Sequence, residues 1–174
     1  MPDLRFPIGK FAPTPNASAE DRARFIRHIA EAPENLRAAV NGLSDEQLET
    51  PYRPDGWTIR QLVHHLPDSH MNAYIRSKLA VTEQGPTIKP YREGLWAELA
   101  DAHKSPIEPS LRLLDALHER WVIFLGSLTP ADFAKPLMHP ESGPMTVDSL
   151  VQLEAWHGRH HVAQITTTRE RMGW

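Results

Sequence analysis

The chain has 174 residues, of which 40 % are hydrophobic and 24 % charged, and its formal net charge is −3. This composition fits one globular domain, 1–174, and argues against nucleic acid as a partner, because no basic surface is available to hold phosphates. No cysteine is present, which excludes disulfides, thiolate metal ligands and a cysteine nucleophile.

The N-terminal segment, residues 1–17, holds four prolines and is predicted to form an extended arm. It lacks the apolar run of a signal peptide, and no window of the chain approaches the ~18 apolar residues of a membrane span. We therefore expect a cytoplasmic protein that does not contact membranes.

The first two long helices begin at recognisable N-caps. Ser18 and Asp21 have the spacing of a capping box, and apolar residues then recur in steps of three to four. Thr58 is the predicted N-cap of the second helix. Pro67 lies inside that helix and is expected to kink it, because proline removes a backbone donor and crowds the preceding turn.

The second half of the chain is also predicted to be helical. Residues 84–106 form a long connection with a short helix around Trp96, and a third long helix starts near Ser105. A short helix at SLTPADF precedes a loop over residues 135–145, and the last helix begins at Thr146. Because no segment shows the alternation of a strand, the predicted fold is all-α, a four-helix bundle with short extra helices.

The segment WHGRHH, residues 156–161, lies inside the last predicted helix. His157 and His161 are four residues apart, so their Cβ atoms lie ~5–6 Å apart on one face and both imidazoles can bind one metal ion. His160 is a competing partner, but position i+4 lies nearer to i on a helix than i+3 does. Such pairs are often solvated; here apolar residues share their face, which favours a buried metal-binding pair.

A third ligand has to come from another segment. His65 lies on the apolar side of the second predicted helix, which makes it the preferred candidate. His70 stays open as an alternative, and His139 is expected to be solvated in a loop. The remaining candidates are interpreted as single surface histidines: His28, His103 and His118.

Three imidazoles and a water molecule make an open site, which is typical of catalytic rather than structural zinc. Such a site lowers the pKa of water or activates a substrate heteroatom. Asp68, one turn after His65, and Glu154, one turn before His157, are the candidate catalytic carboxylates, as general bases or as acceptors behind the ligands. A solvated surface position is the alternative interpretation of both.

Several segments resemble the YfiT branch of the DinB/YfiT-like metalloenzymes. The similarity covers nearly the whole chain and rests on the phrases PIGKFAP, TPYRPDGWT (50–58), DGWTIRQLVHHLPDSHMNAYIRSKLAVTE (55–83), TIKPYREGLWAEL (87–99) and WHGRHHVAQI (156–165). The resemblance implies a DinB-type four-helix bundle, usually a homodimer. It also implies one divalent metal per subunit, zinc or nickel, on His65, His157 and His161. One departure is Gly158, which weakens the helix by ~1 kcal/mol.

The resemblance leaves three functions open. The branch is described as metal-dependent hydrolases, which suits an open site that activates water on a small-molecule substrate. Wider relatives look like S-transferases that use a low-molecular-weight thiol of the bacillithiol kind, and a chain without cysteine would need such an external thiol. The third alternative is a metal-binding helical dimer without catalytic activity.

Overall fold

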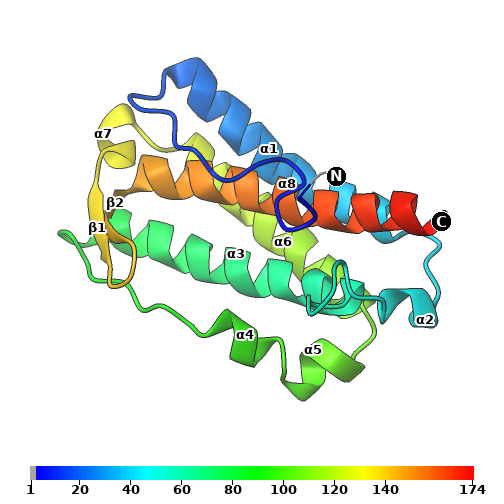
Figure 1. The fold of residues 1–174 in the computed structure, drawn as a ribbon. Helices are drawn as coiled ribbons and strands as arrows, with labels where there is room; N and C mark the ends of the chain where they lie inside the picture. The colour runs from blue at the N-terminus through cyan, green and yellow to red at the C-terminus, as the bar shows by residue number, and fades with distance from the viewer. Residues whose placement is uncertain (1–2) are drawn as a thin grey trace.

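The computed structural model describes residues 3–174 and shows a bundle of four long helices within them (Figure 1). The long helices are α1 (Ala19–Val40), α3 (Ile59–Thr82), α6 (Glu108–Gly126) and α8 (Val147–Met172). Helices α1, α3 and α8 begin at capping boxes, in which the N-cap hydroxyl and the third helical residue satisfy each other's backbone amides. The predicted N-caps Ser18 and Thr58 are confirmed, as are the all-α bundle and the start of the last helix at Thr146, which serves as its N-cap.

The four long helices do not pack in chain order. Helix α1 packs against α6 and α8, and α3 packs against the same two helices, so α1 and α3 occupy diagonal positions in the bundle. Helices α3 and α8, which carry the predicted metal ligands, are therefore direct neighbours. Within residues 3–174, no helix is long and apolar enough to cross a membrane.

Shorter helices and a small sheet connect the long helices. Helices α4 (Glu93–Trp96) and α5 (Ala100–Lys104) lie along α3, while α2 (Asp45–Leu48) precedes α3 in the chain (Figure 1). Helix α7 (Pro130–Phe133) leads into a two-stranded antiparallel hairpin of β1 (Pro136–His139) and β2 (Gly143–Thr146). The predicted loop at 135–145 is therefore wrong. The strands of the hairpin are only four residues long. Met138 of β1 also forms a β-bridge with Thr87 in the long connection.

One other local prediction needs correction. The third long helix starts at Glu108 rather than near Ser105, because Pro109 rather than Pro106 occupies its first turn. Helix α3 is continuous from Ile59 to Thr82 and includes Pro67, and the kink expected at this proline stays a prediction.

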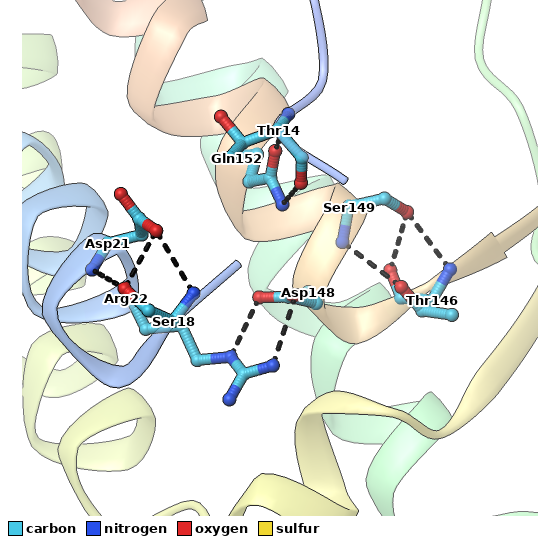
Figure 2. A network of polar contacts seen from close by, with 8 residues as sticks. All are labelled: Thr14, Ser18, Asp21, Arg22, Thr146, Asp148, Ser149 and Gln152. Carbon is cyan, nitrogen blue, oxygen red and sulfur yellow. Dashed lines mark hydrogen bonds and ion pairs between the residues drawn. The ribbon is translucent and has the colours of Figure 1, made fainter. Parts of the chain in front are cut away.

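The N-terminal arm runs antiparallel to α8 along one side of the bundle (Figure 1). The carbonyl of Arg5 accepts from Gln164, and Thr14 exchanges two hydrogen bonds with Gln152. Figure 2 shows the last of these contacts beside the ion pair between Arg22 of α1 and Asp148 of α8. Described residues 3–18 contain no helix or strand; residues 1–2 of the predicted arm lie outside the described chain.

The buried residues form two apolar clusters separated by polar side chains. The hairpin-side cluster consists of Ile29, Ala73, Ala80, Ile88, Trp121, Leu125, Phe133, Leu137, Val147, Leu150, Val151 and Ala155. The opposite cluster consists of Leu36, Ala39, Val40, Leu48, Tyr52, Ile59, Leu62, Val63, Leu66, Leu111, Leu114 and Ile165. Between them on α3, α6 and α8 lies what we call the histidine layer: His65, His70, His118, His157 and His161.

Candidate metal centre

Three histidines from two neighbouring helices converge in the bundle interior. The Nε2 atom of His157 lies 3.3 Å from Nε2 of His65 and 3.0 Å from Nε2 of His161. One ring nitrogen from each of the three lies within 4.8 Å of the others, which suits a single metal ion. The structure thus brings together the three predicted ligands. His157 and His161 share a face of α8 because they are four residues apart, and α3 supplies His65 from the side.

Burial keeps these imidazoles neutral. It lowers the pKa of His65 to about 4, and it lowers the pKa values of His157 and His161 well below the usual value, with further lowering by their mutual proximity. Neutral imidazoles offer the lone pairs that a divalent cation needs, without having to lose a proton at pH 7.

The side-chain amide of Gln164 orients His161. Its nitrogen donates to the carbonyl of Arg5 at 3.1 Å, so its oxygen faces Nδ1 of His161 at 2.8 Å. Because an amide oxygen only accepts, His161 carries its proton on Nδ1 and leaves Nε2 bare. That bare nitrogen points at the other two rings, and an electron-rich pocket of this kind fits a cation.

Of three further buried histidines, one contradicts its prediction. His118 is 1 % exposed, so its interpretation as a surface residue is wrong; its ring lies in the core, 2.8 Å from the ring of His70. His70 is completely buried, and its Nε2 atom lies 3.1 Å from Nδ1 of His157. His160 stacks on Trp156 instead of joining the three converging rings.

The two candidate carboxylates occupy different surroundings. Glu154 is buried, with Oε2 3.5 Å from Nε2 of His70 and 3.8 Å from Nδ1 of His157. Burial raises its pKa to about 8, an effect that the positive charge of Arg76 opposes. Asp68 is half-buried, and burial and then Asp101 raise its pKa to about 6. Of these two carboxylates, only Glu154 lines the cavity in front of the histidines.

Two cavities reach the converging histidines. The first, about 340 Å³, opens between the hairpin, the long connection and α8, and the second, about 300 Å³, opens between the arm and the loop before α3. Trp57, His160 and His161 line both. Polar residues that sequence reasoning did not assign line the first: Ser69, Arg76, Tyr91, Glu93 and Glu141. His139 also lines it, although a solvated loop position was predicted.

The structure explains the glycine in the last helix. A Cβ atom at Gly158 would lie 3.2 Å from Cβ of Ala32 and 3.3 Å from Cε1 of His70. Both distances are tighter than ordinary contacts, so the glycine lets α8 approach α1 and the His70 ring closely.

Comparisons with known proteins agree with this architecture. The family model described as DinB superfamily matches residues 28–165. A "putative metal-dependent hydrolase" of Bacillus mycoides strain KBAB4 is 53 % identical over 174 residues, and one of Bacillus cereus strain B4264 is 51 % identical; in both cases all of each chain is covered.

A solved structure has the same fold. YfiT from Bacillus subtilis, described as "a probable metal-dependent hydrolase with an unusual four-helix bundle topology", aligns with a TM-score of 0.96 and 45 % sequence identity. The alignment covers 98 % of each chain.

Proposed function

The chain belongs to the DinB superfamily, and from that membership we propose that it is a metal-dependent hydrolase whose cation is held by His65, His157 and His161. The observation that carries the proposal is the convergence of three neutral ring nitrogens beside a cavity that all three rings line. Imidazole ligands suit both zinc and nickel, and we propose zinc, with nickel as the alternative. A cation bound there supplies Lewis acidity and activates a water molecule.

Glu154 is the residue we propose as proton acceptor. Its carboxyl group lines the first cavity beside His157. The pKa of Glu154 falls below its cation-free value when a positive charge occupies the site, because a nearby cation favours the carboxylate. The carboxylate then takes a proton from the attacking water while the water oxygen bonds to the electrophilic carbon, and the protonated Glu154 returns that proton to the leaving group.

Arg76 is the residue we propose to bind the substrate. Its Nη2 atom donates to the carbonyl of Lys89 at 2.9 Å, while its buried Nε has no hydrogen-bond partner among residues 3–174. Arg76 also lines the first cavity, and a guanidinium there favours a substrate that bears a carboxylate or develops negative charge on oxygen.

Elemental analysis of the purified protein tests the metal site. We expect about one zinc or nickel per chain, lost in a His65→Ala, His157→Ala, His161→Ala triple variant and retained in His160→Ala, which removes a neighbouring ring that points elsewhere. A native protein that holds no metal and takes up none on titration would refute the site. Hydrolysis of small esters, amides and epoxides, lost in Glu154→Gln with metal retained, then tests the catalytic part.

A second candidate function is a metal-dependent S-transferase that uses a low-molecular-weight thiol. The two cavities that share His161 favour it, because a thiol and an electrophile could reach one cation from different sides. The chain itself supplies no thiol. Running the substrate screen with and without an added thiol separates the two: strict thiol dependence establishes the transferase. Metal removal that unfolds the protein, with no substrate turned over under either condition, points to a structural metal.

A further inference from the structure

A chain of ring-to-ring contacts leads away from the converging histidines into the core. Nδ1 of His157 lies 3.1 Å from Nε2 of His70. Nδ1 of His70 in turn lies 2.8 Å from Nε2 of His118, and Nδ1 of His118 lies 2.6 Å from the carbonyl oxygen of Ile29 in α1. The chain crosses from α8 through α3 and α6 to α1, and His70 and His118 are at most 1 % exposed.

The carbonyl at its end determines where every proton sits. A backbone carbonyl can only accept, so His118 must carry its proton on Nδ1. A neutral His118 then has a bare Nε2, which accepts from Nδ1–H of His70. Nε2 of His70 is bare for the same reason, and it accepts from Nδ1–H of His157. A neutral ring has one N–H and one bare nitrogen, so every contact in the chain joins one donor to one acceptor.

We propose that His70 and His118 are positioning residues that hold His157 in its Nδ1–H tautomer, with Nε2 bare and aimed at the cation site. The proposal rests on the metal site of the proposed function. A ring nitrogen must be unprotonated to bind a metal, and the partner of the other nitrogen sets which one that is. Gln164 does this for His161 over one contact, whereas His157 depends on a carbonyl three contacts away.

The geometry favours this assignment over a second metal site. His70, Glu154 and His157 lie close enough to hold an ion of their own. That ion would require His157 to bind metals through both nitrogens, and therefore to lose its last proton, in the bundle interior where its side chain is only 17 % exposed. The hydrogen-bonded chain satisfies the same atoms with neutral rings, which costs less in a medium of low polarity.

Histidine nitrogen spectra of the metal-free protein test the tautomers directly. We expect protonated Nδ1 and bare Nε2 for His157, His70 and His118. In a His70→Leu variant, His157 loses its acceptor and should populate both tautomers. An unchanged His157 signal in that variant would overturn the proposal. Because no metal is present, this readout stands even if the protein proves to bind none, in which case the proposed function fails separately.

Metal affinity gives the second readout. Losing the group behind a ligating histidine typically weakens binding 10–100-fold, so we expect about that loss in His70→Leu and His118→Leu. His118→Gln restores an acceptor toward His70 and should recover most of the affinity. His64→Leu is the matched control: His64 is also buried on α3, but its Nδ1 contacts Ser110, 2.7 Å away and outside the chain of rings.

The outcomes separate cleanly. Weaker metal binding in the His70 and His118 variants, with native affinity in His64→Leu, supports the positioning role. An equal loss in His64→Leu would assign the effect to packing of α3 and overturn the proposal. Saturation of the native protein at two metal ions per chain would also overturn it, because His70 would then be a ligand.

Discussion

The histidine layer and the two apolar clusters on either side of it differ in the side chains that they bury. The clusters consist of aliphatic and aromatic side chains, most of them from the four long helices. The layer places five imidazoles between the clusters, four of them buried, next to the buried carboxyl group of Glu154. Burying polar groups destabilises a fold unless each finds a partner.

The difference indicates that the clusters stabilise the fold and that the layer binds the metal. Fold stability comes from the clusters, because burial of apolar area contributes about 25 cal/mol per Å². Hydrogen bonds within the layer fix the orientations of the rings. One nitrogen each of His65, His157 and His161 remains directed at a common point. We therefore expect substitutions in the clusters to change stability, and substitutions in the layer to change metal binding.

The largest stability effect is expected from Leu114→Ala in the opposite cluster. Leu114 is completely buried, and truncation of such a leucine costs about 2–5 kcal/mol through lost transfer energy and the cavity left behind. Urea unfolding measures the loss. Metal content per chain should remain at the native value, because Leu114 is not part of the histidine layer.

His161→Ala is the converse test. It should abolish metal binding while the metal-free variant unfolds near the urea concentration of the metal-free native protein. A metal-free His161→Ala protein as unstable as Leu114→Ala would contradict the division between layer and clusters.

Acid is expected to act on the layer first. Burial lowers the pKa of His118 to about 4 from a usual value of 6.5. Above pH 6.5 both the folded and unfolded states hold this ring neutral. As the pH falls from 6.5 toward 4, only the unfolded state takes up the proton, so stability falls, by on the order of 3 kcal/mol for this ring.

The difference between two variants isolates this effect from the titrating carboxylates. His118→Gln removes the buried ring, so its stability should vary less with pH between 6.5 and 4 than that of the native protein. Thr58→Ala, which removes no titratable group, should keep the native slope. Equal slopes in all three proteins would show that His118 is not held neutral by the fold.

The ligand helices were predictable because their signals are local. The capping boxes at Ser18 and Thr58 involve residues three apart, and the i, i+4 spacing places His157 and His161 on one face. His118 was misassigned although it follows Leu114 and precedes Trp121 at core-facing steps, so periodicity could have indicated its burial.

Other features depend on contacts that no local pattern contains. The partner of His118 at Ile29 lies 89 residues away, and Arg5 reaches Gln164 across 159 residues. The hairpin was missed because its four-residue strands contain glycine and prolines and show no alternation. The metal identity and the partner chain of the expected homodimer remain predictions.

Gly158→Val sharpens the comparison at the border of the layer. A side chain here presses on Ala32 and the His70 ring, and overpacking of this kind costs about 1–3 kcal/mol. We expect a loss of stability together with weaker metal binding, since His70 must move. Gly126→Val, where a Cβ atom meets nothing within 4 Å, is the control and should leave metal binding unchanged. Normal metal affinity in Gly158→Val would mean that the ring tolerates displacement.

The smallest effect is expected at the N-terminus of α3, the helix that carries both His65 and His70. The hydroxyl of Thr58 accepts from the amide of Gln61 at 3.1 Å, and the Gln61 side chain accepts from the amide of Thr58 at 2.9 Å. Thr58→Ala leaves the backbone amide of Gln61 without its acceptor, so it should lower the free energy of unfolding by about 1 kcal/mol. Thr58→Ser keeps the hydroxyl and should stay near native stability in the same urea titration.

Metal affinity should be native in both variants, because the cap acts two turns before His65 and touches none of the layer's hydrogen bonds. Weaker metal binding in Thr58→Ala alone would show that the end of α3 and its histidines are coupled, and that stability and metal binding are not separable along this helix.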